Sequence, residues 1–260
     1  PLTGSHPPGP PAAPSDMTYL SAVGPLGRSA GDLRTALQVT AGPEAPAARA
    51  WRWALARPRH SRLEDVRVGV VLDHGQAPVS GEVGAVLSDA VDALARAGAT
   101  VAAGWPEGVD PVAQAESFGF QVRLFFAYQE PGDDLPPFAE VVDQERRRMA
   151  ARAAWGRYFQ DVDVFLCPAS FTTAFPHDPR PFQDRTIATP EGERPYADQV
   201  FWVAQPALPG LPAVAAPVGR SAAGLPVGAQ VVGPLHEDDT AITVAELLAE
   251  VAGGYQPPPL

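Results

Sequence analysis

The stretch Pro209–Gly233 reads PGLPAVAAPVGRSAAGLPVGAQVVG and decides the fold of this chain. It contains two short apolar segments, at 212–217 and 227–232, separated by Ala223-Gly224. Glycine permits positive φ and close backbone approach, and proline fixes φ where a strand begins or ends. Because the connection between the two segments is short, the stretch predicts two neighbouring antiparallel strands.

A second unit is predicted upstream of this stretch. Residues 66–72 (VRVGVVL) form a continuous apolar run typical of a buried strand. Apolar residues then recur every three or four positions over 80–98, which predicts a helix that ends at Gly98. Residues 99–103 (ATVAA) read as another strand. Strand, helix and strand in this order predict a parallel βαβ unit with a right-handed crossover.

The rest of the chain alternates helices and loops. We expect helices near 29–42 (capped by Ser29), 110–130, 136–161 and 238–252, a strand at 162–167, and a Pro- and Arg-rich loop at 170–195. Residues 1–16 carry many prolines and no periodicity, so they predict an extended arm. The fold class that follows is α/β, with a mixed β-sheet flanked by helices.

Composition excludes several classes of function. The formal charge of −11 argues against a polyanion-binding surface, so no nucleic-acid partner is expected. The sequence contains no lysine, which excludes a Walker phosphate loop and Schiff-base chemistry. Neither strand of the βαβ unit is followed by GxGxxG. We therefore predict no nucleotide cofactor.

Cysteine content and hydropathy bear on the compartment. A single cysteine allows no internal disulfide and fits a reducing environment. The longest apolar stretch, 200–219, contains four prolines, which a lipid-exposed helix would not tolerate. We therefore expect a cytoplasmic protein without a membrane-spanning segment.

A few side chains could carry chemistry. Cys167 ends a predicted strand, where open α/β sheets place ligands, and His177 could serve as its base. A small buried apolar role for Cys167 is the stronger interpretation. Ser170 could line a pocket or satisfy loop backbone. The run 236–239 (HEDD) resembles metal ligands but is better explained as a turn and helix N-terminus, and no metal site is predicted.

Three blocks of the sequence resemble one family, the amidase-signature hydrolases. The first block consists of Gly210-Leu211-Pro212, Pro217, Gly219, Gly224-Leu225-Pro226, Gly228, Gln230 and Gly233. The other two are 155–168 (WGRYFQDVDVFLCP) and 23–33 (VGPLGRSAGDL). Together they are similar, in order, to the C-terminal portion of these enzymes, so 17–260 would be the C-terminal part of a single amidase domain.

The resemblance implies hydrolysis of a carboxylic amide by a serine nucleophile, a bridging serine and a lysine base. All three lie in the family's N-terminal half, so no catalytic residue is assigned here, and the chain alone is expected to be inactive. Its partners would be that N-terminal half and a small-molecule amide; a homodimer stays open. The residues expected to line a substrate pocket are Cys167, Ser170, Phe171, Gln199 and Trp202.

Two other interpretations remain at this point. The chain could be a non-catalytic scaffold or binding subunit, or it could belong to a transamidation (amidotransferase) subunit of the same family.

Overall fold

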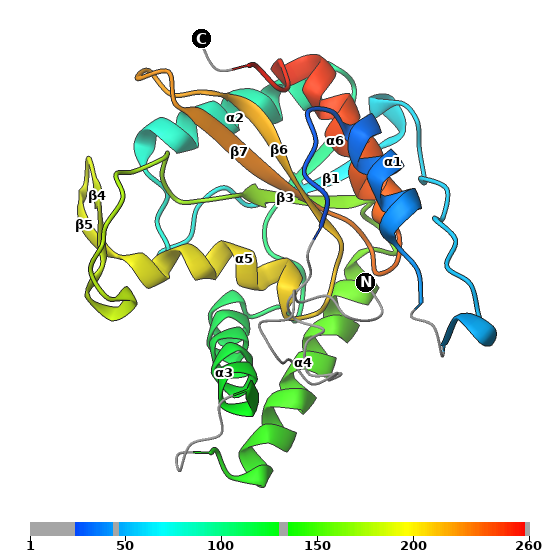
Figure 1. Cartoon of the computed structure of the whole chain (residues 1–260). Helices are drawn as coiled ribbons and strands as arrows, with labels where there is room; N and C mark the ends of the chain where they lie inside the picture. Colours follow the sequence, from blue (N-terminus) through cyan, green and yellow to red (C-terminus); the bar gives the residue numbers. More distant parts are fainter. Residues whose placement is uncertain (1–23, 44–46, 130–134, 258–260) are drawn as a thin grey trace.

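The computed structural model describes residues 24–43, 47–129 and 135–257. The arm predicted at 1–16 lies outside this part of the chain. The centre of the molecule is a five-stranded sheet of order β2-β1-β3-β7-β6 (Figure 1). Its strands are β1 (Arg67–Val70), β2 (Thr100–Ala103), β3 (Val164–Pro168), β6 (Ala213–Arg220) and β7 (Pro226–Val232). The first three are parallel, while β7 is antiparallel to both of its neighbours, so the sheet is mixed as predicted.

The parallel half confirms the predicted βαβ unit. Strand β1 leads through α2 (Gly81–Arg96) to β2, which pairs with β1 in parallel. One apolar face of α2 is buried against the sheet, through Val83, Leu87, Ala90 and Leu94. The spacing of these four residues is the helical period that the sequence showed.

The other half of the sheet confirms the predicted pair of neighbouring antiparallel strands. Strands β6 and β7 pair along their length, and the turn between them is closed by a hydrogen bond from Ser221 N to Leu225 O of 2.9 Å. Gly224 in this turn has φ of +79°, which a residue with a side chain rarely adopts.

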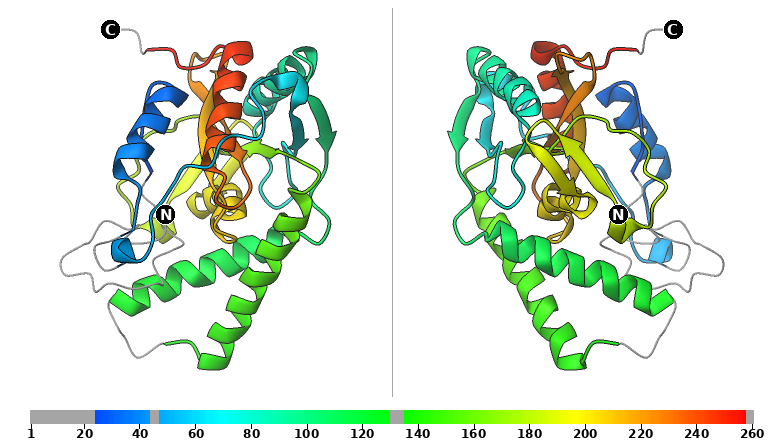
Figure 2. Two further views of the ribbon diagram at one scale, coloured as in Figure 1. Left: turned by 90° about the vertical axis from the view of Figure 1, so that its right-hand side faces the viewer. Right: turned by 90° about the vertical axis from the view of Figure 1, so that its left-hand side faces the viewer.

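Helices cover the two faces of the sheet differently. On one face, α2 and α6 (Asp238–Ala252) pack over a core of valines and leucines. On the other, α5 (Val200–Ala207) lies across the sheet and contacts α3 (Pro111–Gln129), which packs against α4 (Phe138–Tyr158). Figure 2 shows α3 and α4 extending away from the body as a pair. No helix in the described ranges is long and apolar enough to cross a membrane.

The N-terminal helix α1 (Ala30–Thr40) begins as predicted. Ser29 accepts a hydrogen bond from Asp32 N at 3.1 Å, and the Asp32 carboxylate accepts one from Ser29 N at 3.1 Å. These two bonds form a capping box. Arg34 then joins α1 to α6 through an ion pair with Asp239 of 2.6 Å.

One prediction needs correction. The segment 170–195 is not a loop throughout, because β4 (Thr186–Thr189) and β5 (Gly192–Pro195) form an antiparallel hairpin within it. Both strands are only four residues long and mostly polar, so they lack the apolar alternation by which strands are detected. Helix α5 was also not predicted, since Pro206 lies inside it.

Candidate functional site

The end of β3 places Cys167 in the interior, where its side chain is 0% exposed. The amide Nε2 of Gln230 lies 3.6 Å from its sulfur and also donates to Pro168 O at 2.9 Å and Trp202 O at 3.0 Å. Burial raises the pKa of the Cys167 thiol, and the contact with Gln230 only partly offsets this. His177 is exposed on the surface. The structure therefore supports a packing role for Cys167 rather than a nucleophilic one.

Gln230 joins two of the residues predicted from sequence. The side-chain amide of Gln230 donates both to Pro168 O at the end of β3 and to Trp202 O in α5. Gln230 therefore connects the segment that contains Cys167 to the helix that contains Trp202. The Trp202 indole is 0% exposed and stacks on Trp105, with ring centroids 6.2 Å apart. Trp202 and Trp105 both belong to the aromatic core beneath α5.

Phe171 lies in the same core and is also 0% exposed. Its carbonyl accepts a hydrogen bond from Ser80 N at 2.8 Å, and the guanidinium of Arg194 lies 4.6 Å from its ring centroid. Arg194 donates further to Pro78 O at 2.6 Å. The hairpin β4–β5 is thereby attached to the loop that precedes α2.

Ser170 faces a small pocket beside this core. The pocket has a volume of about 240 Å³ and is lined by Ser170, Thr172 and Thr173 together with Val83 and Val227. Thr173 Oγ1 donates to Glu82 Oε1 at 3.0 Å. Gln199 is placed differently, because its amide donates to Tyr196 O, 3.2 Å away within the turn before α5. The structure thus groups Cys167, Phe171 and Trp202, with Ser170 at their margin.

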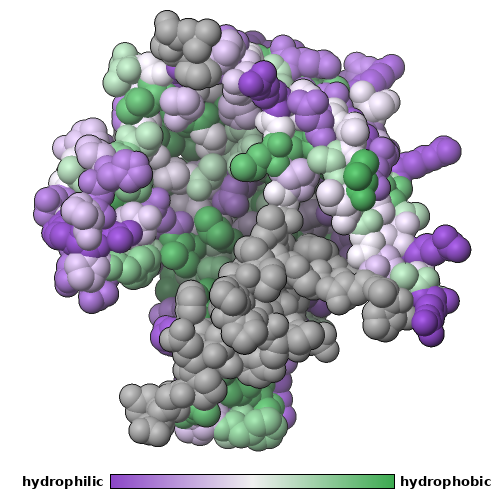
Figure 3. Space-filling model, viewed as in Figure 1, coloured by the Kyte–Doolittle hydropathy of each residue, from purple (hydrophilic) through white to green (hydrophobic). Residues whose placement is uncertain are grey.

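Strand β6 forms one edge of the sheet, and no strand in the described ranges pairs with its outer side. Pro212 O accepts a hydrogen bond from Gly233 N at 2.9 Å, so the backbone of Pro212 faces β7. In an antiparallel pair, successive residues point their backbone N–H and C=O groups alternately toward and away from the partner strand. The backbone groups of Ala213 and Ala215 therefore lie on the open side of β6. Both side chains are exposed. Figure 3 shows this surface hollowed between β6–β7 and α5, with apolar residues along α5.

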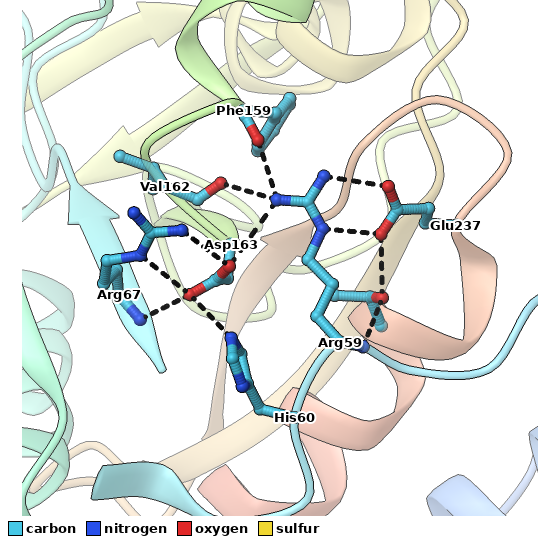
Figure 4. A network of polar contacts seen from close by, with 8 residues as sticks. Arg59, His60, Arg67, Phe159, Val162, Asp163 and Glu237 are labelled. Atoms are coloured by element: carbon cyan, nitrogen blue, oxygen red, sulfur yellow. Dashed lines mark hydrogen bonds and ion pairs between the residues drawn. The ribbon is translucent and has the colours of Figure 1, made fainter. Parts of the chain in front are cut away.

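A polar cluster lies at the amino-terminal ends of the parallel strands β1 and β3, away from the end of β3 that contains Cys167 (Figure 4). Its centre is Asp163, whose side chain is 1% exposed. Arg67 donates to it from its backbone N at 2.8 Å and from its guanidinium at 3.3 Å, and Arg59 and His60 lie 3.5 Å away. Burial disfavours the Asp163 carboxylate, but the hydrogen bonds from Arg67 outweigh it and hold the pKa below its usual value.

Arg59 joins this cluster to α6. It binds Glu237 with two hydrogen bonds, of 2.7 and 2.8 Å, and also donates to Phe159 O at 2.7 Å. The hydrogen bonds with Glu237 raise the pKa of the Arg59 guanidinium, so it stays charged. Glu237 therefore belongs to an ion pair at the start of α6. Sequence analysis missed the cluster, because its members are far apart along the chain and form no motif.

Residues 138–242 match a family model described as Amidase. Among curated relatives, a glutamyl-tRNA(Gln) amidotransferase subunit from Nitrobacter hamburgensis is 32% identical over 103 residues, which is 38% of this chain and 19% of that protein. The corresponding protein from Xanthobacter autotrophicus is 36% identical over 98 residues, 38% of this chain and 18% of that protein.

Solved structures share the fold over most of this chain. A glutamyl-tRNA(Gln) amidotransferase subunit from Thermotoga maritima has a TM-score of 0.68 at 18% identity, covering 87% of this chain and 52% of that one. A bacterial aryl acylamidase of the amidase-signature family gives 0.65 at 17% identity, covering 88% and 52%. Fatty acid amide hydrolase gives 0.70 at 15% identity, covering 96% and 52%.

These comparisons define an α/β protein with the fold of amide-bond enzymes. Residues 138–242 resemble the amidase family, and the fold over most of the chain is that of amidase-signature enzymes. It spans about half the length of the solved structures, and its aligned segment covers about a fifth of the curated relatives.

Proposed function

We propose that the complete protein hydrolyses a carboxylic amide, and that this chain supplies the part of the amidase domain beside the reacting groups. The observation that carries the proposal is the family match at 138–242, joined to a fold that covers 87% of this chain and 52% of a solved relative. Fold alone does not define a reaction, so the proposal rests on the family match at 138–242.

The chemistry of amide hydrolysis explains why a further segment is needed. A nucleophile must attack the carbonyl, a base must take its proton, and backbone N–H groups must stabilise the developing oxyanion. The resemblance assigns these roles to two serines, a lysine and a serine-rich loop, and this sequence contains no lysine. We propose that the N-terminal half of the family's domain provides them.

The open edge of β6 supports this arrangement. Within the described ranges no strand pairs with the backbone groups of Ala213 and Ala215 on this side, so these groups can extend the sheet. An exposed edge is usually paired or covered in a stable protein. Their small exposed side chains leave room for another layer on the face that holds Trp202. We propose that the N-terminal half lies there, and that Cys167, Phe171 and Trp202 support the wall of the substrate pocket from behind, with Ser170 and Gln199 nearer its margin.

The test is to express the complete reading frame and to measure carboxylate and ammonia release from a panel of small amides. We expect hydrolysis that is abolished when the proposed serine nucleophile is replaced by alanine. An upstream sequence without a lysine and a serine-rich segment, or a complete protein that hydrolyses none of the amides, would overturn the proposal.

Transamidation is a second candidate, because the curated relatives are named as parts of an amidotransferase. Such a protein would release ammonia from glutamine for a second site in a partner protein. Strong preference for glutamine over other amides, together with co-purification of such partners, would favour it. A non-catalytic scaffold would leave the complete protein folded and inert.

A further inference from the structure

We propose that the pocket beside Ser170 binds a small uncharged carboxamide, which is held by one donating and one accepting hydroxyl group. The pocket lies at the carboxyl end of β3, between the first turn of α2, the loop that follows β3 and the start of β7. Open α/β sheets place their ligands at this end of the parallel strands. The identification of this ligand as the substrate rests on the proposed function.

Two hydroxyl groups in the pocket wall have opposite hydrogen-bonding roles. Thr173 Oγ1 lies 3.0 Å from Glu82 Oε1, and a carboxylate accepts hydrogen bonds but has no proton to donate. The hydroxyl proton of Thr173 therefore points to Glu82, and its oxygen is left as an acceptor. Ser170 Oγ accepts a hydrogen bond from Thr172 N at 3.3 Å, and its own proton has no acceptor within the described residues. Ser170 is therefore the donor of the pair.

A primary carboxamide matches this pair of hydroxyl groups. Its carbonyl oxygen can accept from Ser170, and its N–H groups can donate to the oxygen of Thr173. A carboxylate has no N–H group, so it would leave the Thr173 oxygen without a partner and would bring a negative charge close to that of Glu82. Because a polar group left unpaired weakens a complex, the pocket favours the amide over the corresponding acid.

The rest of the wall is apolar and sets the size of the ligand. Val83, Phe175, Pro226 and Val227 are its largest side chains. The volume of the pocket is about 240 Å³, and a cavity of about 150 Å³ already holds benzene. The pocket therefore has room for one aromatic ring or a short branched chain together with its carboxamide.

No charged side chain of the described residues lines this pocket. Glutamine carries an ammonium and a carboxylate group in addition to its side-chain amide. Both charges would lose water on entry without gaining a partner of opposite charge, which disfavours binding. The pocket therefore favours the amide of an uncharged acyl group, and this supports direct hydrolysis of such amides over transamidation from glutamine.

Isothermal titration calorimetry on the purified chain tests the proposal, with benzamide, sodium benzoate and glutamine as the probes. We expect one saturable site for benzamide, and binding of benzoate and glutamine that is at least about tenfold weaker. Ser170→Ala removes the donor and should weaken benzamide binding about threefold to tenfold, the effect of one neutral hydrogen bond. Glu82→Gln removes the negative charge and can itself donate to Thr173. The ratio of benzamide to benzoate affinity should then fall by a similar factor.

Two matched controls complete the design. Ser88→Ala removes an exposed hydroxyl group of α2, and Glu116→Gln removes an exposed carboxylate of α3. Both variants should bind the three probes like the unaltered chain. The proposal is overturned by absence of saturable benzamide binding, by benzoate or glutamine that binds as tightly as benzamide, or by an unchanged affinity ratio in Glu82→Gln. A folded Ser170→Ala variant with unaltered benzamide affinity also overturns it. If Ser170→Ala does not fold, Glu82→Gln decides.

Binding to the chain is measured without any reaction, so the two proposals fail separately. A complete protein that hydrolyses no amide would overturn the proposed function and leave the binding result standing. A chain that binds no benzamide would overturn this site and leave the proposed hydrolysis to its own test.

Discussion

The phenol of Tyr158 lies directly over Gly69, so that a methyl group at position 69 would overlap its hydroxyl oxygen. Gly69 is the third of the four residues of β1, and Tyr158 ends α4, so this contact sets how closely the helix approaches the sheet. The phenol is partly buried, which raises its pKa to about 12. Phe165 and Trp155 pack around the ring and restrict its movement.

Gly69→Ala should therefore destabilise the chain, by about 1–3 kcal/mol, because the added methyl forces Tyr158 out of its packed position. Chemical denaturation measures the loss. Gly156→Ala is the matched control, since Gly156 lies in α4 with open space around its Cα and a helical alanine is favoured over glycine. That control should be neutral or stabilising; a loss as large as that of Gly69→Ala would count against the steric explanation.

Asp163→Asn should cost about 2–3 kcal/mol of unfolding free energy, because a buried carboxylate that neutralises Arg67 and Arg59 is lost. The cost stays below that of a fully buried pair, since both guanidiniums retain contact with water. Asp65→Asn is the control, because Asp65 is 51% exposed and lies 3.6 Å from Arg62. Its effect should be under about 0.5 kcal/mol. Equal losses in the two variants would contradict the account of the cluster.

The lowered pKa of Asp163 makes the unfolding free energy depend on pH. Its pKa is lower in the folded chain than the ordinary value of 3.8, so its contribution is present above about pH 4 and is lost as pH falls through the folded pKa. The difference in unfolding free energy between the unaltered chain and Asp163→Asn should be constant from neutral pH to about pH 5 and shrink below pH 4. Parallel denaturation series at several pH values measure it. A difference that grows towards low pH would show the sign to be wrong.

Cys167 should react with a thiol reagent only when the chain opens, because the side chain is inaccessible and burial raises its pKa. We expect slow labelling by DTNB under native conditions and immediate labelling in guanidinium chloride. Gln230→Leu should speed native labelling, since it releases the bonds from Gln230 to Pro168 and Trp202. Fast stoichiometric labelling of the native chain would contradict the packing role.

The parts of the fold that follow from local pattern were predictable. Val83, Leu87 and Leu94 repeat at the period of a helix, and the glycine turn before Val227 joins an antiparallel pair, so both halves of the sheet could be inferred. The hairpin β4–β5 could not, because its strands are too short and polar to show a period. The burial of Cys167 was also foreseen from residue type.

The site was less accessible to sequence analysis. Trp202 was a candidate, but its connection to Cys167 through Gln230 depends on three segments that only the folded sheet brings together. The cluster around Asp163 joins Arg59 and Glu237, which are 178 residues apart. Such contacts leave no spacing in the sequence from which a motif could be read.

The most direct test of the central claim is a complementation assay for amide hydrolysis. This chain, the upstream half of its reading frame, and the two combined are each incubated with the amides that the complete protein accepts. The account predicts that neither half alone releases carboxylate and that the two together do. Hydrolysis by this chain alone, or an inert mixture of two folded and associated halves, would contradict it.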